Sequence, residues 1–289
     1  MRGAYRADSA RPMKRFAAIL ILLATATLVR GADATNEVSV FADKHLEAAV
    51  RQQVFAKRDT DKPLTAADVA TVAVIEGNGR GITNLAGLEH CKAVASIDLA
   101  GNRIADLGPL KGLKSLQYLN IASNLVRDVK PLATVGALQY VQLEANQVAD
   151  AAPLAACTNL ASLYLSKNQL KSIASLTNLP KLVTLYVDGN QLKSVAGLEN
   201  LKWLTTLSLS RNRISDVSPV AGLRAPSLVM AEQNRIKDLE PLLKAARADL
   251  AGGKNWAPFL RLYLKGNPLS SKSKKGLEEL GKEGLRADR

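Results

Sequence analysis

The sequence predicts an α/β solenoid, a fold in which one short unit repeats along an axis and each copy packs on the next. Three observations predict it. Asparagines recur every 22 residues, apolar residues keep fixed places around each asparagine, and the residues before each asparagine alternate between apolar and polar. A fixed period of this length is typical of repeat proteins. The seven asparagines are Asn102, Asn124, Asn146, Asn168, Asn190, Asn212 and Asn234.

The residues around Asn168 show how one copy is built. Leu160, Leu163 and Leu165 precede it and Leu170 follows, which gives the pattern L-x-x-L-x-L-x-x-N-x-L of a leucine-rich repeat. The alternation predicts a strand, because successive side chains of a strand point to opposite faces. After the asparagine the apolar spacing lengthens to three, which favours a tight coil or a 3₁₀ turn. Stacked coils then predict a leucine-rich repeat horseshoe with a parallel concave sheet.

The repeated asparagine is predicted to be structural. A carboxamide donates and accepts hydrogen bonds at once, so each asparagine can satisfy backbone groups of two adjoining coils. One coil buries too few apolar side chains to fold alone, and stability comes from stacking on its neighbours. We therefore assign the asparagine ladder to the turn between coils and give it no catalytic role.

The two ends of the chain depart from the repeat. Residues 35–71 carry helical apolar spacing and the capping-box pattern Thr65-x-x-Asp68, which predicts a helical N-terminal cap. About nine coils are expected over 72–269, irregular between 240 and 260, where the apolar spacing fits a longer helix. Residues 270–289 are predicted to form a C-terminal helical cap and tail.

Residues 1–34 have the layout of a secretory signal peptide. Basic residues precede an apolar run from Phe16 to about Val29, and Ala32-Asp33-Ala34 offers a small-x-small cleavage site. An uncleaved membrane anchor is the alternative interpretation. Cleavage predicts a secreted or periplasmic protein with no stable membrane insertion.

The cap and the first repeat resemble those of bacterial internalin-type proteins. The resemblance is carried by Phe41-x-Asp43-x-x-Leu46, by Leu64-Thr65-x-x-Asp68 and by the stretch 79–88, and it extends over residues 38 to about 245. It implies a secreted or surface protein that binds other macromolecules on the concave sheet. The sequence lacks the immunoglobulin-like domain and wall anchor that often follow in this family, so a role in host-cell invasion is not carried over.

Outward strand positions are the informative ones for function, because core packing does not dictate them. Tyr118 and Tyr140 fall on adjacent coils, as do Tyr164 and Tyr186. Exposed tyrosines are typical of binding hot spots, although tyrosine also suits cross-strand pairs in any sheet. Because these side chains should face solvent, their truncation is expected to change stability little. The predicted partner site is Tyr118, Tyr140, Gln142, Glu144, Tyr164, Tyr186, Asp188 and Ser208.

The formal net charge is +13, and residues 1–34 hold six basic and two acidic residues, which leaves +9 on the rest. A positive field favours anionic partners at long range. Secretion and the absence of a nucleic-acid-binding motif argue against nucleic acid. The expected partner is a protein or another macromolecule, and the positive charge makes an anionic one the favoured kind. The alternative is a structural scaffold of the periplasm or cell envelope with no dedicated ligand.

Catalysis, cofactors and metals are not expected. The only histidines are His45 and His90, and the register keeps them away from the partners that nucleophilic catalysis needs. One aspartate recurs four residues after the asparagine in five copies, at Asp106, Asp128, Asp150, Asp216 and Asp238. Single carboxylates on successive turns usually accept local backbone N–H groups, and a metal site is the alternative.

Cys91 and Cys157 hold the same repeat position three coils apart. Strands that stack about 4.8 Å apart would separate them by about 14 Å, beyond the roughly 7 Å limit for a disulfide. Both are therefore predicted to be free, buried thiols.

Overall fold

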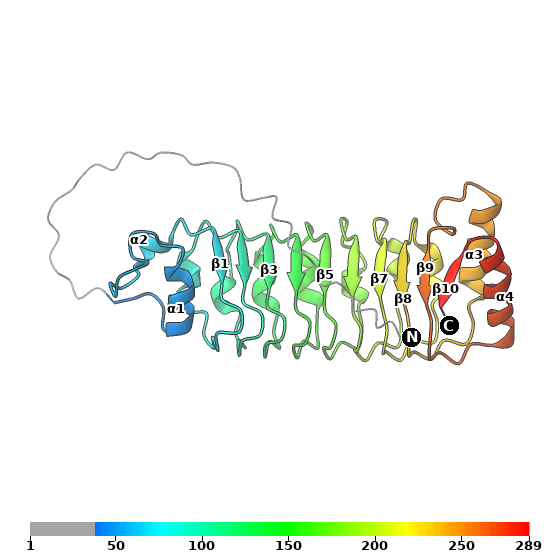
Figure 1. The fold of residues 1–289 in the computed structure, drawn as a ribbon, viewed down its shortest axis with the longest axis horizontal. Coiled ribbons are helices and arrows are strands. Elements are labelled where there is room, and N and C mark those ends of the chain that lie inside the picture. Colours follow the sequence, from blue (N-terminus) through cyan, green and yellow to red (C-terminus); the bar gives the residue numbers. More distant parts are fainter. Residues whose placement is uncertain (1–37, 289) are drawn as a thin grey trace, which may run out of the picture. The chain divides into compact units, whose positions relative to one another are not determined.

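The structure, a computed structural model, describes residues 38–288, and the predicted signal peptide at residues 1–34 lies outside the described residues. Ten short strands form one parallel sheet in which every strand pairs with its neighbours in sequence (Figure 1). The strands are β1 Val74–Glu76, β2 Ser96–Asp98, β3 Tyr118–Asn120, β4 Tyr140–Gln142, β5 Ser162–Tyr164, β6 Thr184–Tyr186, β7 Thr206–Ser208, β8 Leu228–Met230, β9 Arg261–Tyr263 and β10 Arg286–Asp288.

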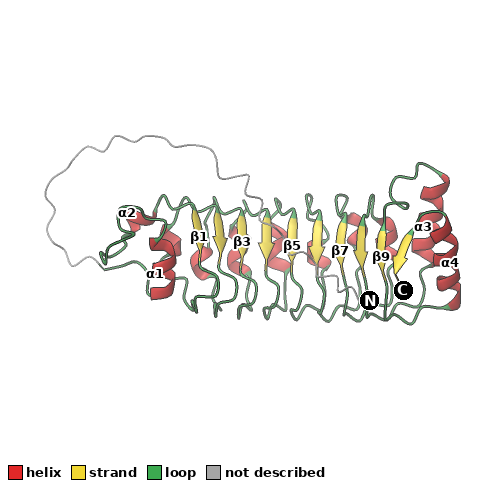
Figure 2. Ribbon diagram, in the orientation of Figure 1, coloured by secondary structure: helices red, strands yellow, loops and turns green. Residues whose placement is uncertain are grey.

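Short 3₁₀ helices lie behind the sheet and return the chain from one strand to the next (Figure 2). Four of them have a proline in their first two positions, where its missing N–H costs no hydrogen bond. The 3₁₀ helices are η1 Leu88–His90, η2 Gly108–Leu110, η3 Lys130–Thr134, η4 Ala152–Ala156, η5 Ala174–Leu176, η6 Leu198–Asn200 and η7 Ser218–Gly222. Parallel strands with tight returns and helical ends confirm the predicted α/β solenoid.

One continuous apolar core runs through all the coils. In the coil of Asn168, Leu160, Leu163, Leu165 and Leu170 are all completely buried, as the alternating pattern predicts. The strand side chains between them point away from the core and are only partly buried. The repeat pattern therefore fixes which side chains remain available on the outside of the sheet.

The asparagine side chains join each coil to the one before it. The amide nitrogen of Asn168 donates to the carbonyls of Leu143 and Leu165 at 2.9 and 3.0 Å, and its oxygen accepts from the backbone N–H of Val148 at 2.9 Å. Leu143 and Val148 belong to the preceding coil. The same three kinds of bond recur at Asn102, Asn124, Asn146, Asn190, Asn212 and Asn234.

The N-terminal cap contains helices α1 Lys44–Arg51 and α2 Ala66–Val69. Asp43 caps α1, and its second carboxylate oxygen accepts from the backbone N–H groups of Thr83 and Asn84 at 2.7 and 3.1 Å in the first coil. Burial alone would raise the pKa of Asp43, but these hydrogen bonds outweigh it and lower the pKa. One ionised carboxylate thus attaches the cap to the solenoid.

At the C-terminal end, helix α3 Glu240–Ala251 replaces the 3₁₀ return, at the place where the sequence predicts a longer helix. Helix α4 Ser271–Lys282 follows, with Ser270 as its N-cap. The chain then ends in β10, which pairs with β9 and was not predicted. Figure 1 shows α3 and α4 together beside this last pair of strands. In residues 38–288, no helix has the length and apolar composition needed to cross a membrane.

Both cysteines are free and buried. Burial raises the pKa of Cys91 to about 12 and the pKa of Cys157 to about 11, so both thiols are protonated at neutral pH. We expect the native protein to react negligibly with a thiol reagent, and the denatured protein to show two thiols without reductant. Titration under both conditions tests this. An intramolecular disulfide in the non-reduced protein would contradict the register of the coils.

Candidate partner-binding face

The side chains that point outward from the strands form the face that the sequence predicts to be concave, and we call it the sheet face. It comprises the first and third residues of each strand and the residue two places beyond. The strand register places Tyr118 beside Tyr140, and Tyr164 beside Tyr186, as predicted. Gln142 lies beside Tyr164, so the two tyrosine pairs occupy neighbouring columns on consecutive strands.

The four tyrosines form one continuous row, which we call the tyrosine ladder. The rings of Tyr118 and Tyr140 stack with centroids 4.5 Å apart and an interplanar angle of 11°. Tyr140 also contacts Tyr164 at 5.3 Å, and Tyr164 meets Tyr186 edge to face at 5.1 Å. The contact between Tyr140 and Tyr164 crosses from one column to the next. It was not predicted, because register alone shows neighbours within a column.

Mutual packing leaves the ladder half-buried. Burial raises the pKa of all four phenols, so their hydroxyls are neutral at physiological pH and able to donate hydrogen bonds. Because each ring packs against one or two others, we expect these side chains to contribute more to stability than solvent-facing positions alone would predict. Stacked or edge-to-face pairs contribute about 0.5–1.5 kcal/mol each.

Two predicted polar residues border the ladder, Gln142 at the end of β4 and Glu144 two residues beyond it. The side-chain oxygen of Gln142 accepts from the backbone N–H of Glu144 at 3.0 Å. The carboxylate of Glu144 pairs with Lys167 of the next coil at 2.8 Å, and both side chains are substantially exposed. These residues offer polar groups beside the rings, although the charge of Glu144 is largely offset by its partner.

Asp188 is the centre of a hydrogen-bond network across three coils. Its carboxylate accepts from the hydroxyl of Ser166 at 2.9 Å, from the backbone N–H of Ser210 at 2.9 Å and from the hydroxyl of Ser208. Ser208 is only 2% exposed. Its hydroxyl is buried and already donates to the Asp188 carboxylate, so Ser208 holds Asp188 in place and offers little surface to a partner.

Asp98 on β2 was not among the predicted site residues. Its Oδ1 atom is buried without a hydrogen-bond partner, the one such side-chain atom in the described part of the chain. The register places Asp98 beside Asn120 of β3, the strand that also carries Tyr118. Its position on the sheet face follows from the repeat, but the missing partner depends on how neighbouring side chains pack over it.

The recurrent aspartates cap the backbone, as the first of the two interpretations proposed. Each accepts from the N–H group two residues further on, at 2.8 or 2.9 Å. Ser172 and Ser194 make the same bond in the two copies that lack aspartate. Within residues 38–288 no group of three or more potential metal ligands comes together.

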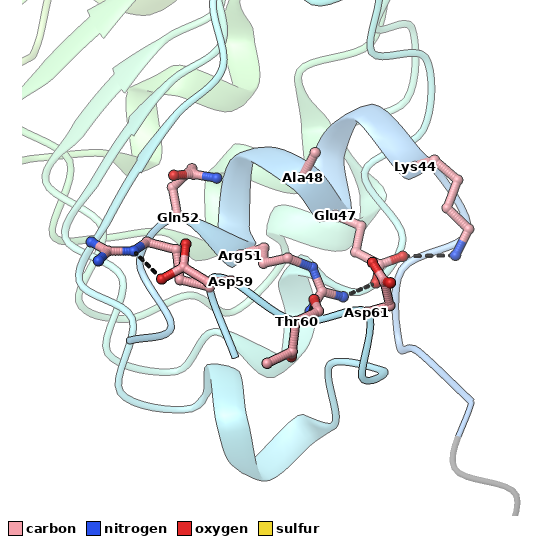
Figure 3. Close-up of a pocket in the computed structure, with 9 residues that line it drawn as sticks. Lys44, Glu47, Ala48, Arg51, Gln52, Asp59, Thr60 and Asp61 are labelled. Atoms are coloured by element: carbon pink, nitrogen blue, oxygen red, sulfur yellow. Dashed lines mark hydrogen bonds and ion pairs between the residues drawn. The ribbon is translucent and has the colours of Figure 1, made fainter. Parts of the chain in front are cut away.

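The hollow beside α1 belongs to the cap (Figure 3). It has a volume of about 410 Å³ and is lined mostly by polar residues, of which Lys44 pairs with Glu47 and Arg58 with Asp59. Arg51 pairs with Glu47 and also donates to the backbone carbonyls of Lys57, Thr60 and Lys62 at 3.1, 3.0 and 2.8 Å. These groups hold the loop after α1 in place, so we assign the hollow a structural role.

Comparisons with known proteins agree with this architecture. The family described as Leucine Rich repeats (2 copies) matches residues 92–134, 158–200 and 180–222. The structure is similar to that of internalin C2 from Listeria monocytogenes, at 30% identity and a TM-score of 0.65, with 73% of this chain and 95% of that chain covered. No curated protein sequence matches the chain significantly.

Two more distant structures share the fold. Internalin F from Listeria monocytogenes is 21% identical, with a TM-score of 0.62 and coverage of 88% of this chain and 92% of that chain. A leucine-rich repeat protein from Leptospira interrogans is 23% identical, with a TM-score of 0.62 and coverage of 70% and 50%.

Proposed function

This chain belongs to the bacterial internalin-like leucine-rich repeat proteins, and from that premise we propose that it is a secreted or periplasmic, non-enzymatic module that holds a protein partner on its sheet face. The tyrosine ladder is the observation that carries the proposal. Tyrosine provides a large amphipathic contact area at a low cost in side-chain entropy. Tyr118, Tyr140, Tyr164 and Tyr186 place four such side chains on consecutive strands.

The surroundings of the ladder support a contact surface. The hydroxyls of the four phenols are neutral donors, and Gln142, Glu144 and Asp188 add acceptors at its margins. An aromatic centre with a polar rim is the usual composition of a protein interface. The proposed contact set is therefore the tyrosine ladder with Gln142, Glu144 and Asp188.

A structural scaffold of the envelope is the second candidate. The observation that favours it is the packing of the tyrosines against one another, which gives the rings a role in stability without any partner. A scaffold should tolerate changes on the sheet face that leave the fold intact. A binding module should lose its partner with the same changes.

Capture of partners from envelope extracts distinguishes the two candidates. The bait is the exported protein, compared with the double variant Tyr140→Ala/Tyr164→Ala and with Trp203→Ala. Trp203 is 59% exposed in the turn before β7, so it is a matched aromatic control away from the ladder. We expect one partner to be retained by the unchanged protein and the control and lost by the double variant. Equal recovery by all three would contradict binding at the ladder.

Export is a separate prediction. The basic lead, the apolar run and the Ala32-Asp33-Ala34 site predict removal of residues 1–34. Mass spectrometry of the exported protein should therefore find a chain that starts at residue 35. An intact N-terminus on protein that is released from the membrane would contradict cleavage.

A further inference from the structure

We propose that the sheet face selects a basic segment of its protein partner, and that Asp98 holds a lysine or arginine side chain of that segment beside Tyr118 and Tyr140. This inference rests on the proposed function, because it specifies the chemistry of the partner at the same face. It differs from the long-range expectation of an anionic partner, which was based on net charge alone.

Charge is segregated between the sheet face and the rest of the protein. The whole chain has a formal net charge of +13, of which residues 35–289 carry +9. The outward positions of the coils of β1 to β8 nevertheless include no lysine or arginine. Their charged residues are all acidic: Glu76, Asp98, Glu144, Asp188 and Glu232. Because complementary charges steer encounter and suppress wrong partners, this face favours a basic partner, whereas the rest of the protein carries a net positive charge.

Basic residues return to the sheet face only beyond this region. Arg261 is the first residue of β9, and Lys265 lies two residues beyond that strand. Asp98 is on β2, near the opposite end of the sheet. Acidic residues are thus spread over the coils of β1 to β8, while the basic ones lie at β9 and at β10, where Arg286 is offset by Asp288. A lysine or arginine side chain of the partner is therefore favoured away from β9, and the region of β2 and β3 lies well away from it.

Asp98 differs from the other carboxylates of the face in residues 38–288 because one of its oxygens is buried without a hydrogen-bond partner, and the exposed Glu76 lies beside it in the strand register. Glu144 is paired with Lys167, and the oxygens of Asp188 accept from two serine hydroxyls and a backbone N–H group. Asp98 instead has a buried oxygen that accepts no hydrogen bond. Buried polar atoms without a partner are rare in folded proteins. A lysine ammonium or an arginine guanidinium that binds the Asp98 carboxylate supplies the missing donor, and to reach Oδ1 it must displace the side chains that cover this oxygen.

The tyrosines beside Asp98 suit the same cation. Asp98 is close enough to Tyr118 and Tyr140 for its charge to contribute to the raised pKa of both phenols, after the larger effect of burial on each. A cation near an aromatic face is stabilised by the ring quadrupole, and the effect grows when the cation is desolvated. A carboxylate next to stacked rings therefore recognises a long basic side chain through its charge and its aliphatic stem.

Two labelled peptides of equal length test the inference by fluorescence anisotropy, one alternating lysine with threonine and the other glutamate with threonine. They are titrated against the exported protein, Asp98→Asn and Asp216→Asn. Asp216→Asn is the matched control, because this substitution removes the same charge at a position away from the sheet face. The asparagine oxygen can still accept from the backbone N–H of Ser218. We expect the basic peptide to bind and Asp98→Asn to weaken it about tenfold, against less than twofold for the control. Equal effects of the two variants, or tighter binding of the acidic peptide, would overturn the inference.

The captured partner separates this inference from the function on which it rests. If Tyr140→Ala/Tyr164→Ala abolishes capture and Asp98→Asn weakens it, both stand. If the tyrosine variant abolishes capture while Asp98→Asn binds the partner as tightly as Asp216→Asn does, the inference fails and the proposed function stands. If the tyrosine variant still captures the partner, the proposed function fails. Competition by a polyanion, with none by the basic peptide, would also overturn the inference.

Discussion

Asn168→Ala should lower the free energy of unfolding by about 3 kcal/mol or more. The substitution removes two hydrogen bonds to the carbonyls of Leu143 and Leu165 and one from the N–H of Val148, all of them buried. An unsatisfied buried polar group costs about 1–3 kcal/mol, and alanine leaves several at once. The loss should also loosen two coils together, because the bonds join one coil to the next. Denaturant unfolding followed by circular dichroism measures the change.

Asn159→Ala is the matched control for this result. Asn159 also bonds across coils, to the carbonyl of Gly136 at 2.9 Å and to Lys181 at 2.7 Å, but both bonds are exposed. Water can replace exposed partners, so the control should lose less than about 1 kcal/mol. Equal losses for the two variants would mean that burial of the asparagine ladder does not determine its contribution.

Tyr140→Ala should weaken binding of the captured partner about 30-fold, which is the effect of losing roughly 2 kcal/mol at an interface anchor. It should also lower the free energy of unfolding by about 2 kcal/mol, because Tyr140 contacts the rings of both Tyr118 and Tyr164. Tyr186 ends the ladder and contacts one ring only. Tyr186→Ala should therefore cost about half as much stability.

Calorimetric titration with the partner and denaturant unfolding of both variants provide the two measurements. Unchanged affinity in Tyr140→Ala would remove the ladder from the interface and leave it a structural role. Equal stability losses in the two variants would instead contradict the additive packing of rings along the ladder.

The sequence predicts the fold well because one rule is repeated in every coil. Leu163 and Leu165 are buried and Tyr164 is not, as period-two alternation requires. The last strand, β10, was missed because Arg286-Ala287-Asp288 has no apolar alternation. Its pairing depends on the free edge of β9, which is a tertiary feature that local patterns do not encode.

The candidate site was predictable in position but not in detail. Register places the four tyrosines on one face, yet the contact between Tyr140 and Tyr164 depends on side-chain rotamers. Ser208 was expected on the surface, but it is buried, and its hydroxyl donates to the carboxylate of Asp188 in the preceding coil. Asp98 was passed over because a missing hydrogen-bond partner appears only when all neighbouring side chains are in place.

Hydroxyl-radical footprinting of the protein with and without its captured partner tests the central claim most directly. Oxidation rates of Tyr118, Tyr140, Tyr164 and Tyr186 report on the ladder. Two exposed aromatic residues outside the ladder serve as internal references in the same sample. They are Trp203, which is 59% exposed, and Phe55, which is 85% exposed. Binding at the sheet face predicts that oxidation of the tyrosines falls several-fold on complex formation while both references are unchanged. Protection of Trp203 or Phe55 with unchanged tyrosines would contradict the account.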